Sequence, residues 1–175
     1  MIAERNYFWD NVKAFLILCV VMGHALEGDS LKTDASVFVD TLIYSFHMPA
    51  FIFVSGFFAK RYCTDGKVRA EKAVTLFAYY IIFQILFTVI CTLLNVEVNI
   101  SLFEPRRGLW YLLTLFVLYL LTPIIEKLPA WLVLPISVVF ALMVINDESS
   151  TTFLSIARLF TFAPYYFAGY YIGDK

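Results

Sequence analysis

The amino-acid sequence predicts an all-α fold: a polytopic membrane bundle of about six transmembrane helices. Of its 175 residues, 61% are hydrophobic and 15% are charged. A soluble domain is instead about half apolar and a quarter charged. Six apolar runs also approach the roughly 20 residues that a helix needs to cross the hydrocarbon core of a bilayer. They occupy residues 8–26, 37–59, 73–94, 109–125, 131–146 and 153–173.

The connections between these runs are short and polar, without a linker, a repeat or a low-complexity segment, so we expect one transmembrane domain over residues 1–175. Because five more apolar runs follow the first, that first run is predicted to be a span and not a cleaved signal peptide. The formal net charge of −1 gives no reason to expect a nucleic-acid partner. The three cysteines are scattered without metal-ligand spacing, so no metal site is predicted.

The positions of lysine and arginine predict the orientation in the membrane, because cytoplasmic loops are enriched in these residues. If the N-terminus is inside, most of the 13 basic residues fall on the inner side. These inner residues are Arg5, Lys13, Lys60, Arg61, Lys67, Arg69, Lys72, Lys127 and Lys175. We therefore expect both termini to lie inside (N-in, C-in) in a cytoplasmic membrane, either inner or plasma.

The first apolar run carries polar residues at both ends. Too few residues separate Lys13 from Glu27 to cross a bilayer, so the span must begin earlier and include Asp10 and Lys13 within the inner boundary. Lys13 and His24 are eleven residues apart, which is three helical turns and about 16 Å, so both project from one stripe of the helix. A stripe of this kind predicts a polar partner, since lipid offers none.

The second apolar run is also interrupted by polar residues. Asp40 lies about one turn from its outer end, His47 lies near its middle, and Ser55 precedes a glycine that permits close helix packing. With His24, which lies close to the outer end of the first span, this hairpin holds three ionisable residues, more than lipid tolerates without a polar cavity or partners. Ionisable residues within spans usually line a cavity or a functional site, so this hairpin is the predicted site.

These same residues resemble a known family. The run WDNVKAFLILCVVMGHA resembles the opening helix of the acyltransferase-3 family of integral membrane acyltransferases, in which a basic residue precedes a histidine by eleven positions. Lys13 takes the basic place and His24 the histidine place. The segment SFHMPAFIFVSGFF is similar to the family's Phe-His-Met-Pro … Ser-Gly segment, and GLWYLLTLFVLYLL and PYYFAGYYIG are similar to its later helices. The resemblance favours the fucose O-acetylase-like subgroup.

The resemblance also implies about ten spans, whereas this sequence has six apolar runs. We therefore expect these 175 residues to be either the N-terminal portion of a larger domain or a degenerate member of the family.

The resemblance implies transfer of an acyl group, commonly acetyl from acetyl-CoA, to a hydroxyl of a carbohydrate or cell-surface glycan. Such a transfer needs a general base and hydrogen-bond donors for the developing oxyanion. His24 is the candidate base, or alternatively a covalent carrier of the acyl group. Lys13 would bind part of the acyl-CoA or hold the helix in place; the alternative is an interfacial lysine paired with Asp10.

Four further predictions concern supporting residues. Asp10 would orient Lys13, and Asp40 could orient His24. His47 could sense the substrate, donate a hydrogen bond to the acyl carbonyl, or form a hydrogen bond to a neighbouring helix. Ser55 is the fourth supporting residue. The phosphates of CoA would be attracted by basic residues in the loop after the second span: Lys60, Arg61, Lys67 and Arg69. The inner position of this loop already explains its positive charge, however.

Two alternative functions remain open from the residues alone. A membrane transporter or receptor could use the same intramembrane polar residues to bind a ligand. A b-type haem protein could use His24 and His47 as axial ligands, but their different depths in the membrane disfavour that pairing.

Overall fold

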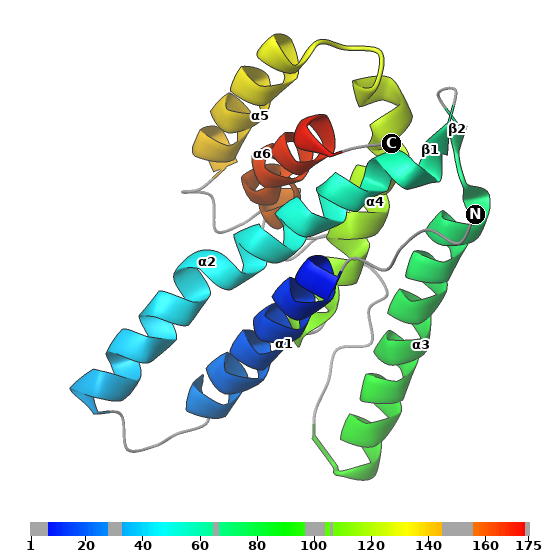
Figure 1. Cartoon of the computed structure of the whole chain (residues 1–175). Helices are drawn as coiled ribbons and strands as arrows, with labels where there is room; N and C mark the ends of the chain where they lie inside the picture. Colours follow the sequence, from blue (N-terminus) through cyan, green and yellow to red (C-terminus); the bar gives the residue numbers. More distant parts are fainter. Residues whose placement is uncertain are drawn as a thin grey trace. The chain divides into compact units, whose positions relative to one another are not determined.

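The structure, a computed structural model, describes residues 7–27, 33–64, 67–96, 104–105, 107–144 and 156–173. Six α-helices make up most of it (Figure 1). They are α1 (Tyr7–Glu27), α2 (Asp34–Ala59), α3 (Ala70–Leu93), α4 (Trp110–Ile125), α5 (Ala130–Val144) and α6 (Ile156–Ile172). Two 3₁₀ turns, η1 (Lys60–Tyr62) and η2 (Arg107–Leu109), precede α3 and α4. Strands β1 (Cys63–Thr64) and β2 (Lys67–Val68) pair antiparallel in a hairpin between α2 and α3.

The predicted all-α fold is confirmed, since every apolar run of the sequence forms a helix. The spans Tyr7–Leu26, Asp34–Tyr62 and Ala70–Leu93 are long and apolar enough to cross a membrane. Helices α4 and α5 are equally apolar but shorter, with 16 and 15 residues. The short β hairpin lies in the predicted basic connection and does not change the fold class.

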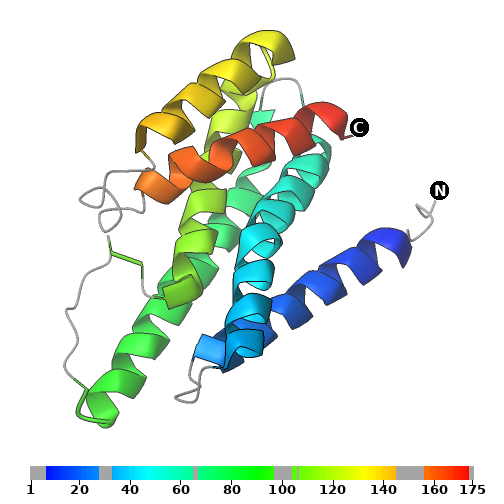
Figure 2. The same ribbon diagram turned by 90° about the vertical axis from the view of Figure 1, so that its left-hand side faces the viewer.

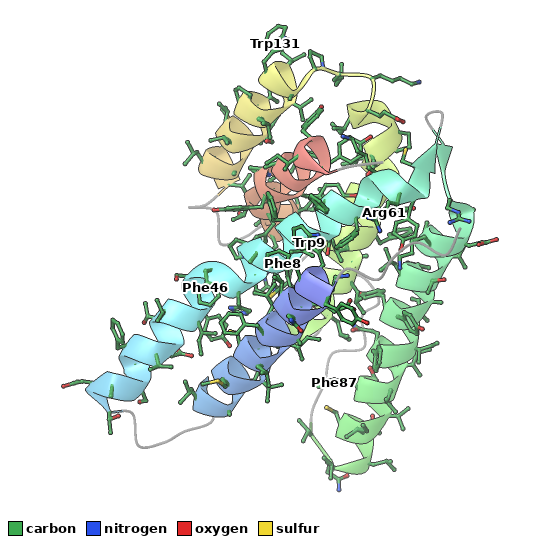
Figure 3. All side chains as sticks on the ribbon, viewed as in Figure 1. Phe8, Trp9, Phe46, Arg61, Phe87 and Trp131 are labelled. Carbon is green, nitrogen blue, oxygen red and sulfur yellow. The ribbon has the colours of Figure 1, made fainter. Side chains whose placement is uncertain are left out.

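The described residues form two compact units, residues 1–52 and 53–175, and the division falls within α2. In the first unit, α1 packs against the beginning of α2. A Cβ atom on Gly23 would lie 3.2 Å from the ring of Tyr44 and 3.5 Å from Ile43, so the helices approach closely at this glycine. Farther along, the ring of Phe46 (labelled in Figure 3) stacks on Phe15 with centroids 6.3 Å apart.

In the second unit, the end of α2 crosses α6 with direct backbone contact at glycines. A Cβ atom on Gly56 would overlap the carbonyl oxygen of Tyr166, and one on Gly169 would overlap the carbonyl oxygen of Phe53. Gly173, one turn beyond Gly169, faces Phe57 in the same way. Small residues four apart allow this approach, which replaces the hydrophobic driving force that helices lack inside lipid.

Helix α4 joins the other helices of the second unit through hydroxyl groups. The hydroxyls of Thr122 and Tyr166 are 2.9 Å apart and link α4 to α6. The Tyr119 hydroxyl donates to the carbonyl oxygen of Tyr62 at 2.9 Å, and Tyr171 of α6 donates to that of Ile125, the last residue of α4, at 3.1 Å. Helices α5 and α6 lie side by side in both views (Figures 1 and 2).

Helix α3 presents most of its surface outward. Its buried residues are Ala73, Tyr80 and Gln84, which recur at helical spacing and form one narrow stripe. On its other faces large apolar side chains such as Val74 and Leu93 are exposed. A helix with apolar residues on nearly all sides and little burial is typical of one surrounded by lipid.

The crossing of α2 and α6 can be tested with Gly169→Ala. The added methyl group meets the α2 backbone, so we expect a loss of about 1–3 kcal/mol in the free energy of unfolding, despite the helix propensity of alanine. The measurement is thermal unfolding of the purified protein in detergent. Gly108→Ala is the matched control, because nothing lies within 4 Å of that position. Unchanged stability in Gly169→Ala would contradict the backbone contact.

Candidate active site

The basic and acidic residues of α1 lie where the sequence places them. Asp10 is in the first turn and His24 in the last turn of one unbroken helix. Since the helix is continuous, the eleven-residue spacing puts Lys13 and His24 on a common stripe, as predicted. Asp10 and Lys13 are partly buried and His24 is exposed, next to the buried Gly23 that contacts α2. The candidate base is therefore accessible from outside the first unit.

His47 of α2 is buried, with 3% of its surface exposed. Its Nδ1 lies 2.6 Å from the carbonyl oxygen of Ile43, one turn earlier in the same helix. A carbonyl oxygen only accepts hydrogen bonds, so Nδ1 carries the proton, and Nε2 of the neutral ring is an acceptor. His47 can therefore donate to an acyl carbonyl only as an imidazolium. The ring also meets Tyr44 edge to face, with centroids 5.1 Å apart.

Asp40 lies on the same face of α2 as His47, two turns earlier. Its Oδ1 is buried and has no hydrogen-bond partner. Leaving a buried polar oxygen unsatisfied costs about 1–3 kcal/mol, so such an atom in a membrane helix points to a site that receives a donor.

The packing of the hairpin relates Asp40 to His24. Gly23 packs on Ile43, one turn from Asp40, and the two helices run antiparallel. His24 and Asp40 therefore lie at the same end of the hairpin, within about one turn in height, as the sequence predicts. That Asp40 orients the imidazole stays a prediction.

Ser55 and the predicted CoA-binding residues belong to the second unit. Ser55 Oγ is 3.0 Å from the hydroxyl of Tyr111 and connects α2 to α4. The ammonium of Lys60 donates to the carbonyl oxygen of Gly173 at 2.7 Å and lies over the ring of Tyr170. Lysine at this place satisfies a carbonyl at the C-terminus of α6 and neutralises its helix dipole. Lys60 thus has a structural role that the sequence did not reveal.

Two other basic residues of this cluster, Arg61 and Arg69, are more accessible than Lys60. Arg61 is exposed (labelled in Figure 3), and its guanidinium lies 5.2 Å from the ring of Phe58. Arg69 is exposed at the N-cap of α3, and its backbone N–H donates to Tyr62. The side chain of Lys67 lies outside the described residues. Among the described side chains of this cluster, those of Arg61 and Arg69 are therefore better placed than that of Lys60 to meet an anion.

Sequence reasoning missed two polar features of the second unit. Thr114 of α4 is 1% exposed, and its hydroxyl has no hydrogen-bond partner. It follows Tyr111 by three residues and so shares the face that meets Ser55, a spacing that is visible in the sequence. The thiol of Cys63 lies 3.3 Å from Oε2 of Glu126, a pair that sequence spacing could not reveal.

Metal coordination has no support in the described part of the chain. Among these residues, no group of three His, Cys, Asp or Glu side chains lies close enough to hold a metal ion.

Long apolar helices that carry polar residues in the first hairpin indicate a membrane protein. A family model described as an acyltransferase domain matches residues 6–175, nearly the whole chain. The chain therefore belongs to the acyltransferase-3 family of membrane acyltransferases. No curated protein and no solved structure matches it.

Exchanging Lys60 and Arg61 separately for methionine would distinguish support of the fold from binding of CoA. Lys60→Met removes the charged hydrogen bond to Gly173, so we expect a loss of about 1.5–3 kcal/mol in the free energy of unfolding, measured by thermal unfolding in detergent. Arg61→Met, at the exposed neighbouring position, should change stability by less than about 0.5 kcal/mol. Equal effects of the two variants would contradict the capping role of Lys60.

Proposed function

We propose that this membrane acyltransferase moves an acetyl or other short acyl group from acyl-CoA to a hydroxyl of a carbohydrate or cell-surface glycan. The observation that carries the proposal is the first hairpin. It holds an accessible histidine, a buried carboxylate oxygen without a partner and a basic residue three turns from the histidine, all in helices that are mostly apolar. The family supports acyl transfer in general; the donor and the acceptor are our proposal.

The proposed chemistry begins with the acceptor hydroxyl. His24 takes its proton while the oxygen attacks the thioester carbonyl, and collapse of the tetrahedral intermediate expels the CoA thiolate, which takes up the proton. Asp40 lies at the same end of the hairpin, so its unpartnered oxygen would orient the neutral imidazole and stabilise the imidazolium. The alternative, attack by His24 itself to form an acyl-histidine, uses the same residues.

Lys13 and the exposed arginines would serve the donor. Lys13, with Asp10 beside it, lies near the inner end of α1 in the proposed N-in, C-in orientation, where cytosolic acyl-CoA arrives. Arg61 and Arg69 offer guanidinium groups suited to phosphate. Lys60 contributes less to CoA binding in this proposal, because Gly173 already accepts from its ammonium. The proposed location is the cytoplasmic membrane.

The proposal predicts the effect of replacing His24. Membranes carrying the full-length protein are given labelled acetyl-CoA, and label in the surface glycan is measured. His24→Gln keeps a hydrogen-bonding side chain but removes the base, so transfer should fall about 10²–10⁴-fold.

Val21→Ala, at an exposed apolar position of the same helix, is the matched control and should retain transfer. Equal transfer by wild type and His24→Gln would contradict the mechanism. Uptake or binding of a ligand without any transfer would indicate a transporter or receptor instead.

A further inference from the structure

A pocket lies between α4, α5 and α6 in the second unit, with a volume of about 220 Å³. Every residue that lines it is apolar except Ser137. The Ser137 hydroxyl already donates to the carbonyl oxygen of Leu134 at 2.8 Å. The pocket therefore offers no charge and no unsatisfied polar group to a ligand.

The pocket has a buried floor and an open rim. Leu118, Ala163 and Phe167 on the floor are at most 6% exposed, whereas Ile136 and Phe140 on the rim are about 45% exposed. Its lining extends from Leu132 to Phe140, about 12 Å along α5. The rings of Phe140 on α5 and Phe160 on α6 both line the pocket and stack with centroids 5.4 Å apart. The pocket is thus elongated and opens to the side of the helices.

The chemistry of the pocket selects a hydrocarbon ligand. An apolar cavity of about 150 Å³ stays dry and binds benzene, so a larger apolar pocket has room for a hydrocarbon group. CoA phosphates, pantetheine amides and sugar hydroxyls would lose their hydrogen bonds to water and gain none here. A side opening between apolar helices faces the region that lipid chains occupy in a bilayer.

The lengths of α4 and α5 also affect how lipids pack beside this pocket. Helices α4 and α5, with 16 and 15 residues, are about 24 and 22 Å long, shorter than a hydrocarbon core of about 30 Å. Lipids beside short helices must thin or rearrange. A lipid chain that enters the pocket fills a void that would otherwise lack contacts.

We propose that this pocket binds one fatty-acyl chain of a bilayer phospholipid. The site goes beyond the proposed acyl transfer and uses none of its residues. The lipid would be a resident of the fold between α4, α5 and α6, held by dispersion and burial and not by its headgroup.

The test uses photolabelling of the full chain in vesicles. The vesicles contain phosphatidylcholine with a small share bearing a diazirine on one acyl chain, and adducts are mapped by mass spectrometry after illumination. We expect adducts at Ile136 and Phe140 to exceed those at Val139 severalfold. Val139 is the internal control, because it is about as exposed on the same helix but does not line the pocket.

Two variants and a second probe make the outcome decisive. Ala163→Leu fills the floor and should lower labelling of the pocket severalfold. Val139→Leu is the control variant and should leave labelling unchanged. Ile136→Trp covers the rim and should also lower labelling, without adding volume to the buried floor. Three outcomes would overturn the proposal. The first is even labelling over all exposed apolar positions, and the second is cross-links to a second copy at these residues. The third is labelling by acyl-CoA with the same diazirine chain but not by phospholipid. The readout does not depend on transfer, so failure of the proposed enzyme activity would leave it unaffected.

Discussion

The absence of water in the bilayer core is the constraint on which this structure depends. A polar group there must find a partner within the protein, because lipid provides none. The second unit meets this requirement repeatedly: Thr122 pairs with Tyr166, Ser55 with Tyr111, and Gln84 with the backbone of Glu104. The glycines at the crossing of α2 and α6 add direct backbone contact between those two helices. Close helix packing and hydrogen bonds between polar groups therefore both stabilise the second unit.

Because most buried polar groups have partners, the buried polar atoms that lack a hydrogen bond are informative. Within the described residues, the buried side-chain oxygens without a partner are Oδ1 of Asp40 and the hydroxyl of Thr114. A fold that satisfies its other buried side chains at these depths keeps an unpaired carboxylate oxygen only at a cost in stability. Strain or missing partners of this kind cluster at functional sites, where a substrate or a catalytic partner completes them. Asp40, at the same end of the first hairpin as His24, fits that role. Among the described residues, Thr114 of α4 is the other buried position with an oxygen that lacks a partner.

The sequence predicted the helices well and the roles of their residues less completely. Apolar runs bounded by charged loops specify membrane helices almost by themselves, so all six helices were predictable. The stripe from Lys13 to His24 followed from helical periodicity alone. Tertiary partners did not follow, since periodicity cannot say which helix a residue meets. Lys60 was indistinguishable in sequence from its basic neighbours, yet it caps α6 through Gly173, 113 residues away. The hydrogen bond from His47 to Ile43, which makes Nε2 an acceptor, likewise required coordinates.

The central claim is that His24 and Asp40 act together as one catalytic unit, and a double-mutant cycle on acyl transfer tests it most directly. The rates of label transfer from acetyl-CoA are compared for wild type, His24→Gln, Asp40→Asn and the double variant, all as full-length protein in membranes. If Asp40 acts through His24, the double variant should be about as slow as His24→Gln alone, because residues that act as a unit are strongly non-additive. A double variant slowed by the product of the two single effects would show that the residues act independently and would contradict the claim.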